Sequence, residues 1–200
     1  MSKIKLCGLT RIEDIEAVNE LKPDYIGFVF ASKSKRYISP QKAKILKNLL
    51  DPSIKAVGVF VNASPENIAE LLNENIIDIA QLHGNEDDDF ITKLRSFSGK
   101  PIIKAFTIKS ENDIEAAQKS TADYVLLDSG AGTGQAFNWS LIKNIKRDYF
   151  LAGGLSPENA LDAVKKLHPF ALDVSSGIET NGIKDKQKMA DFIRKGKEYD

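Results

Sequence analysis

The sequence contains a single cysteine, Cys7, and only two histidines, His83 and His168, among its 200 residues. One cysteine excludes an internal disulfide and any metal site built from several cysteines. With so few histidines, a conventional His-rich metal site is not expected either. We therefore predict a protein without a metal centre and without disulfide bonds.

Long apolar runs and an excess of charge of one sign are also missing. No apolar run approaches the ~20 residues that span a bilayer, and the segment Met1–Lys5 lacks the apolar core of a signal peptide. Lys plus Arg and Asp plus Glu both number 28, so the formal net charge is zero. A duplex-binding protein usually carries a basic excess or stripe. We expect a cytoplasmic protein that binds neither nucleic acid nor membranes, and whose anionic ligands are small and locally held.

Short apolar runs alternate with helix-like segments along the chain. The eight runs are Ile4–Cys7, Tyr25–Phe30, Ala56–Val61, Ile76–Leu82, Ile102–Phe106, Tyr124–Leu127, Tyr149–Ala152 and Phe170–Val174. Several are apolar at nearly every position, which is typical of parallel strands buried on both faces. Strict alternation predicts a parallel sheet with right-handed crossovers. Eight units favour a closed (β/α)8 barrel, with residues 1–200 as one domain, over an open doubly wound sheet of about five or six strands.

Several helix starts can be predicted from local signals. Three segments open with a Ser-Pro pair: Ser39-Pro40, Ser64-Pro65 and Ser156-Pro157. A serine N-cap followed by proline at the first helical position is a favourable helix start. The acidic run Glu86–Asp89 is predicted to form the first turn of a helix, where negative charge suits the helix dipole.

In either parallel architecture the active site lies at the carboxyl ends of the strands. Cys7 ends the first run, where a thiol can act as a nucleophile or a base. Strand alternation places Lys5 on the same side as Cys7, and a cation there favours the thiolate. The alternative is a small buried hydrophobe, which is the commoner fate of cysteine.

A basic loop, Ser32–Tyr37, follows the second run. The fork of Arg36 suits a carboxylate or a phosphate, and a solvated position is an equal alternative. For Lys33 and Lys35 the solvated position is favoured.

Two further strand ends carry polar groups. Asp128 ends an apolar run and is either an acid or base, or a carboxylate that caps a helix or fixes a loop. His83 lies on the same side of its strand as Gln81 and is a general base, a substrate contact or a structural group. We favour the last two roles for His83.

Glycine-rich loops follow the last three runs. They are Gly130–Gly134, which contains Gly132 and Gly134, then Gly153-Gly154, and finally Ser175-Ser176-Gly177. Glycine lets backbone amides approach an anion closely. Phosphate sites in eight-stranded barrels often use the loops after strands 7 and 8, so the last two loops predict a phosphate site. The first loop fits neither the dinucleotide fingerprint nor a P-loop.

Taken together, these segments resemble the phosphoribosylanthranilate isomerases of tryptophan biosynthesis. The resemblance runs nearly end to end and is specific in its order and spacing, although residues 100–121 carry little of it. The segments that carry it are Lys5–Thr10, Gly27–Phe30, Ser34–Ser39, Gln81–Gly84, Leu127-Asp128, Gly132–Gly134, Ala152–Leu155 and Asp173–Glu179.

The resemblance implies an Amadori rearrangement of N-(5′-phosphoribosyl)anthranilate, with Cys7 as general base, Asp128 as general acid and Arg36 receiving the anthranilate carboxylate. It implies no cofactor, and we expect a monomer or a homodimer. We expect further substrate contacts from His83, Gly132, Gly134, Gly153, Gly154, Ser175, Ser176 and Gly177.

The chemistry fits these assignments. Asp128 could protonate the ring oxygen if burial raises its pKa toward neutrality. Two alternatives are another metal-free phosphosugar isomerase or epimerase, and a catalytically inactive barrel that binds a phosphometabolite. The presence of Cys7, Asp128 and Arg36 argues against the inactive barrel.

Overall fold

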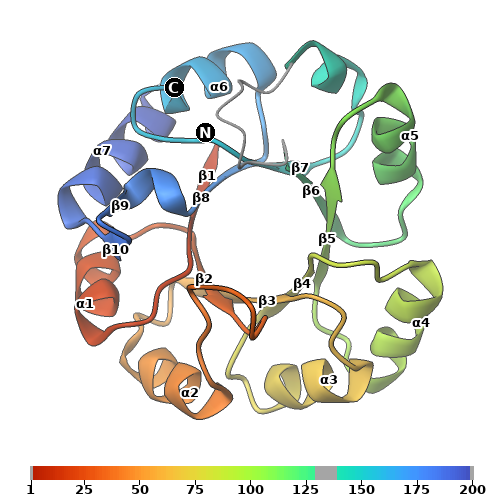
Figure 1. Ribbon diagram of the computed structural model, residues 1–200, viewed down its shortest axis with the longest axis horizontal. Helices are drawn as coiled ribbons and strands as arrows, with labels where there is room; N and C mark the ends of the chain where they lie inside the picture. Colours follow the sequence, from red (N-terminus) through yellow and green to blue (C-terminus); the bar gives the residue numbers. More distant parts are fainter. Residues whose placement is uncertain (1, 129–138, 199–200) are drawn as a thin grey trace.

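Eight parallel strands close into a barrel in chain order, as the computed structural model shows for residues 2–128 and 139–198 (Figure 1). The barrel closes because β1 pairs with both β2 and β8. The strands are β1 (Lys3–Cys7), β2 (Tyr25–Val29), β3 (Lys55–Phe60), β4 (Ile79–Leu82), β5 (Ile102–Thr107), β6 (Tyr124–Asp128), β7 (Tyr149–Ala152) and β8 (Ala171–Val174). Each predicted apolar run contributes one strand, so the predicted (β/α)8 barrel is confirmed.

Helices surround the ring of strands (Figure 1). They are α1 (Ile12–Leu21), α2 (Pro40–Leu49), α3 (Pro65–Asn73), α4 (Asp88–Phe97), α5 (Glu111–Lys119), α6 (Ala160–Leu167) and α7 (Lys186–Lys197), with short 3-10 segments η1 (Trp139–Asn144) and η2 (Ser176–Ile178). Among the described residues, no helix has the length and apolar character needed to cross a membrane.

Two of the three predicted Ser-Pro helix starts are confirmed. Ser39 accepts a hydrogen bond from the backbone N–H of Lys42 at 3.3 Å, and α2 begins at the following proline. Ser64 accepts in the same way from Asn67 at 3.3 Å and begins α3. In both helices the serine satisfies one of the backbone donors that a helix start leaves unpaired.

The third predicted start, Ser156-Pro157, is wrong. Helix α6 begins at Ala160 with Asn159 as its N-cap residue. The Ser156 hydroxyl accepts instead from the backbone N–H of Glu158 at 3.3 Å, and the Asn159 side chain accepts from the N–H of Ser156 at 2.9 Å. These local bonds form a turn that delays the helix by about three residues, which the Ser-Pro signal alone does not reveal.

The acidic run Glu86–Asp89 is only partly helical. Asp88 and Asp89 lie in the first turn of α4, and Asp87 is the N-cap that accepts from the N–H of Phe90 at 2.9 Å. Glu86 lies before the helix and is 5% exposed. Burial there means that its carboxylate serves the loop rather than the helix dipole.

A small antiparallel hairpin, which the sequence did not predict, follows β8. It consists of β9 (Glu179–Thr180) and β10 (Ile183–Lys184), joined through Gly182 at φ 78°. The alternation of apolar and polar residues that marks a strand cannot be recognised over only two residues. The hairpin matters because it carries two charged residues to the mouth of the barrel.

Inside the barrel, the side chains change from apolar to polar toward the carboxyl ends of the strands. The amino-terminal half is filled by a buried apolar cluster that includes Tyr25, Val57, Ile79, Ile103, Leu126 and Phe150. Two residues beyond Ile79 and Leu126 on their strands come Gln81 and Asp128, and Cys7 ends the neighbouring part of the ring at β1. The apolar layers close one end of the barrel, so the polar groups gather at the other.

Candidate active site

A cavity of about 360 Å³ opens at the carboxyl ends of the strands. Its lining includes the predicted site residues Cys7, Arg36, His83, Asp128, Gly153, Gly154, Ser175 and Ser176. Two larger depressions on the outer surface contain none of these residues. The volume falls within the usual range for a small-molecule site, about 300–1,000 Å³.

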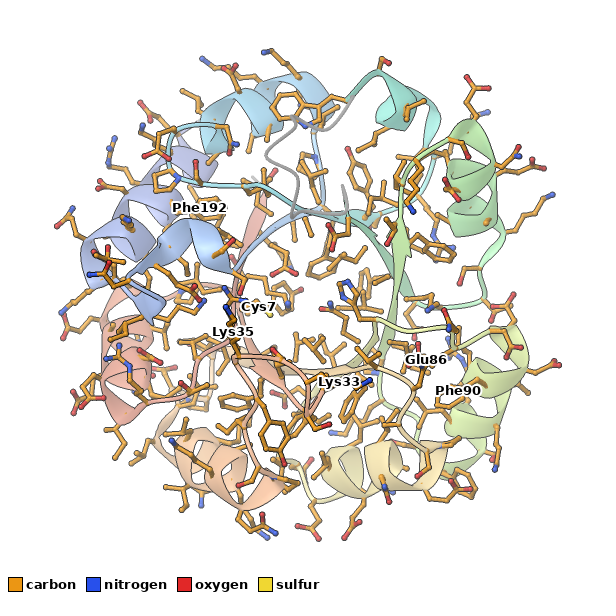
Figure 2. The ribbon with its side chains drawn as sticks, viewed as in Figure 1. Cys7, Lys33, Lys35, Glu86, Phe90 and Phe192 are labelled. Atoms are coloured by element: carbon orange, nitrogen blue, oxygen red, sulfur yellow. The ribbon has the colours of Figure 1, made fainter. Side chains whose placement is uncertain are left out.

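Cys7 lies on the inner side of the ring of strands, whereas Phe90 and Phe192 lie among the outer helices (Figure 2). Cys7 is 8% exposed. A Cβ atom placed on Gly27 of the neighbouring strand would lie 2.5 Å from the Cys7 sulfur. Because Gly27 has no side chain, the sulfur has room to face the cavity.

Charged groups surround the Cys7 sulfur. Burial raises the pKa of the Cys7 thiol above its ordinary value, because a thiolate is poorly solvated inside the barrel. Lys5 and Lys184 act against this rise by stabilising the thiolate, whereas Asp173 acts in the same direction as burial. The structure thus supports the predicted proximity of Lys5 and adds a carboxylate that the sequence analysis did not weigh.

Arg36 is held by Glu179 of the hairpin. Its Nε and Nη2 atoms donate to the two Glu179 carboxylate oxygens at 2.6 and 2.7 Å. Lys184 donates to the same carboxylate at 2.7 Å and to the backbone oxygen of Ser175 at 2.9 Å. Burial would raise the pKa of Glu179, but the hydrogen bonds from Arg36 and Lys184 outweigh it and hold this pKa below its ordinary value.

The Arg36 contact leaves one edge of the guanidinium for a ligand. The fork to Glu179 uses Nε and Nη2 but not Nη1, and Arg36 also lines the cavity. A planar guanidinium presents five hydrogen-bond donors, and one carboxylate occupies only some of them. Arg36 is therefore oriented by the protein and still able to bind an anionic group.

His83 and Asp128 are direct neighbours. His83 Nε2 lies 3.3 Å from an Asp128 carboxylate oxygen, and Gln81 Nε2 lies 3.0 Å from His83 Nδ1. When the Gln81 amide donates to Nδ1, the ring proton sits on Nε2 and is donated to Asp128. His83 is thus placed to orient the Asp128 carboxyl group, a role that the sequence analysis did not assign to it.

A buried ion pair between Glu86 and Lys104 fixes the loop that carries His83. Glu86 accepts from the backbone N–H groups of Asn62 at 2.6 Å and Gly84 at 2.8 Å. Lys104 donates to Glu86 at 3.3 Å and to the carbonyl of Gly84 at 2.7 Å. These bonds satisfy the loop's buried polar groups and hold the end of β4 in one conformation.

The last two glycine-rich loops lie side by side at the cavity. Gly153 and Gly154 have φ values of 90° and 64°, a left-handed conformation that glycine adopts without strain. Gly177 does not line the cavity; a Cβ there would lie 2.0 Å from the Leu155 carbonyl oxygen, so glycine allows the two loops to pack. Gly132 and Gly134 lie outside the described residues.

The basic loop after β2 contains cavity-lining residues and solvent-exposed residues, as the sequence predicted. Ser34 and Arg36 line the cavity. Lys33 and Lys35 are exposed and do not line it. Alternating residues of this loop thus face the cavity and the solvent.

Asp173, Glu179 and Lys184 are the charged residues of the site to which the sequence analysis gave no role. Asp173 and Glu179 lie in the segment Asp173–Glu179 that carried the resemblance, so a signal for them was present. No local signal marked Lys184, because its partners become apparent only when the hairpin folds over the barrel.

The fold and the site together define an eight-stranded barrel enzyme with a thiol and a carboxyl group facing one cavity. A model of the N-(5′-phosphoribosyl)anthranilate (PRA) isomerase family matches residues 4–195. The chain belongs to this family. Among the described residues, no cluster of three or more His, Cys, Asp or Glu side chains is placed to hold a metal ion.

Individual relatives agree with the family match. The N-(5′-phosphoribosyl)anthranilate isomerase of Endomicrobium trichonymphae is 45% identical, with 97% of this chain and 98% of the relative covered. That of Clostridium acetobutylicum is 43% identical, with 100% of both chains covered. The crystal structure of the Thermotoga maritima enzyme matches with a TM-score of 0.91 at 39% identity, covering 99% of this chain and 100% of that chain.

A second matching crystal structure shows a phosphoribosyl anthranilate isomerase in complex with reduced 1-(o-carboxyphenylamino)-1-deoxyribulose 5-phosphate. It has a TM-score of 0.89 at 39% identity and covers 99% of this chain and 100% of that chain.

Proposed function

We propose that this protein isomerises N-(5′-phosphoribosyl)anthranilate to 1-(2-carboxyphenylamino)-1-deoxyribulose 5-phosphate, a step of tryptophan biosynthesis. The observation that carries the proposal is that Cys7 of β1 and Asp128 of β6 line the same cavity from strands that are not neighbours. A base and an acid placed in this way can act on different atoms of one sugar.

In the first step Asp128 protonates the ring oxygen of the ribose. The C1′–O bond breaks, and the nitrogen lone pair forms a C1′=N double bond, so the carboxylic acid becomes a carboxylate and the sugar an open-chain iminium ion. His83, 3.3 Å from Asp128, orients the carboxyl group. General acid catalysis of this kind contributes about 10²–10⁴-fold.

In the second step the Cys7 thiolate removes the C2′ proton. The iminium acidifies this hydrogen, and the electrons of the C2′–H bond move toward the nitrogen to give an enolamine. Protonation at C1′ and loss of the hydroxyl proton at C2′ then yield the ketone. Because the substrate's own iminium accepts the electron pair, the reaction requires no cofactor.

Arg36 is proposed to bind the anthranilate carboxylate. Replacing Arg36 by methionine should raise KM by about 10- to 100-fold, the worth of a hydrogen bond to a charged group. The same variant should lose little with N-(5′-phosphoribosyl)aniline, which lacks the carboxylate. Steady-state kinetics with the two substrates measure the difference.

Lys35→Met provides the matched control, because Lys35 is an exposed cation of the same loop. It should leave KM for both substrates unchanged. An equal loss with both substrates in Arg36→Met would instead assign Arg36 to holding Glu179 and the hairpin.

The substrate phosphate is proposed to bind at Gly153-Gly154 and Ser175–Gly177. Replacing Gly154 by aspartate should raise KM about tenfold or more, because its carboxylate would repel the phosphate. Gly182→Asp is the control, since both glycines have positive φ and open space around an added Cβ. A crystal grown with inorganic phosphate, showing the anion elsewhere and these loops empty, would contradict the assignment.

We also infer that the chain acts as a single barrel domain over residues 1–200, in the cytoplasm, as a monomer or a homodimer. A phosphorylated biosynthetic intermediate as substrate supports the location. One matching structure is described as monomers generated from the dimeric Thermotoga maritima isomerase, which supports either oligomeric state. Sedimentation equilibrium of the purified protein distinguishes the two.

Complementation tests the proposed activity in cells. A bacterial strain that lacks its own PRA isomerase should grow without tryptophan when it produces this protein. The variants Cys7→Ala and Asp128→Asn should not support growth. Absence of growth with the wild-type chain, despite folded protein in the cells, would contradict the proposed function and favour a barrel that only binds the metabolite.

A further inference from the structure

A buried ion pair lies next to Cys7, inside the barrel. Lys5 donates hydrogen bonds to both carboxylate oxygens of Asp173, at 3.0 and 2.9 Å. Lys5 is 0% exposed and Asp173 is 8% exposed. The two residues are register partners on the adjacent strands β1 and β8.

The ion pair is connected to the Cys7 sulfur. Lys5 precedes Cys7 by two residues, so both side chains point into the barrel. The Lys5 ammonium also interacts electrostatically with Cys7. Asp173 lines the cavity beside Cys7. The ammonium group of Lys5 therefore interacts with both a carboxylate and a thiol.

Stability alone does not account for charges at this position. Burying two ions costs several kcal/mol each, and apolar side chains of similar volume are often as stabilising as a buried ion pair. Neighbouring interior residues such as Tyr25 and Val57 belong to the buried apolar cluster. An apolar pair would continue that cluster, so the charges point to a role in the chemistry of Cys7.

We propose that Lys5 and Asp173 are positioning residues that set the protonation of Cys7, with Lys5 stabilising the thiolate and Asp173 opposing it. The inference rests on the proposed function, because it assigns these residues to the base of that reaction. Lys5 counteracts the rise that burial causes and brings the pKa of Cys7 back toward the working pH, where a general base is most effective. Asp173 neutralises part of the Lys5 charge and so limits this effect.

Other charges also face Cys7. Lys184 of β10 stabilises the thiolate, and Arg36 of the loop after β2 interacts with it. Both side chains bind Glu179, which offsets their charge. These groups remain in place when Lys5 or Asp173 is replaced, so a change measured in the variants belongs to the ion pair.

The test uses the alkylation of Cys7 by iodoacetamide as a function of pH. Cys7 is the only cysteine of the chain, so every alkylated thiol is Cys7, and Cys7→Ala gives the blank. Asp173→Asn should move the midpoint of the profile to lower pH, and Lys5→Met to higher pH, each by about one pH unit or more.

Two further variants serve as a replacement for Lys5→Met and as a control. If Lys5→Met does not fold, the double variant Lys5→Met/Asp173→Leu removes both charges and should also move the midpoint to higher pH, because the Lys5 charge affects Cys7 more strongly than the Asp173 charge does. Lys3→Met lies on the same strand two residues before Lys5 and should leave the midpoint unchanged.

Unchanged midpoints in Asp173→Asn and the double variant, or movement of both single variants in one direction, would overturn the inference. The alkylation needs no substrate. Failure of the wild-type protein to turn over PRA would therefore refute the proposed function without altering this result.

Discussion

Replacing Cys7 by alanine should lower kcat by about 10²–10⁴-fold, the usual contribution of a general base. Alanine keeps the small volume beside Gly27 but carries no group that can accept the C2′ proton. Affinity for the product should change little, because Arg36 and the glycine-rich loops remain in place. Single-turnover kinetics and product titration together measure the two effects.

The pH dependence of the wild-type enzyme provides a second measurement of the same role. Burial raises the pKa of the Cys7 thiol, so the thiolate fraction increases as the pH rises toward that pKa. We expect kcat/KM to respond to pH through the thiolate fraction of Cys7. Near-normal turnover in Cys7→Ala would remove Cys7 from the mechanism.

Replacing Asp128 by asparagine should reduce kcat by about 10²–10⁴-fold while the protein remains folded. Asparagine keeps the shape of the side chain, and its oxygen can still accept a hydrogen bond from His83. It cannot deliver a proton to the ring oxygen. KM should change less, because the proton is needed in the transition state rather than in the ground state.

The urea unfolding midpoint separates this role from a structural one. If Asp128 only fixed the loop after β6, asparagine should be tolerated, since it caps about as well as aspartate. An unchanged midpoint with lost kcat supports the general acid. A preserved kcat would contradict the assignment whatever the midpoint.

The strands of this fold could be predicted because each one is a nearly continuous apolar run. Parallel strands buried on both faces leave this signal in the sequence itself. The boundary of a strand differs from the prediction where apolar residues are buried outside the strand. Ile76 and Ile77, for example, are buried but lie before β4. The start of α6 was missed because local side-chain bonds at Ser156 and Asn159 compete with the helix.

The ends of strands identified Cys7, Arg36, His83 and Asp128, because a parallel barrel gathers its strand ends at one mouth. Strand alternation also predicted Lys5 beside Cys7, but the carboxylates that pair with Lys5 and Arg36 could not be predicted from spacing. Lys5 and Asp173 are 168 positions apart, and Arg36 and Glu179 are 143 positions apart. Such pairs form only when β8 closes against β1 and the hairpin folds over the mouth.

The most direct test of the central claim is turnover of PRA by the purified protein in the presence of a chelator. The fluorescence of the anthranilate group should fall at a rate proportional to enzyme concentration, and neither Cys7→Ala nor Asp128→Asn should reproduce that rate. Substrate that binds to the protein while its fluorescence persists, or turnover that stops when the chelator is added, would contradict an isomerase that works by side-chain acid–base catalysis alone.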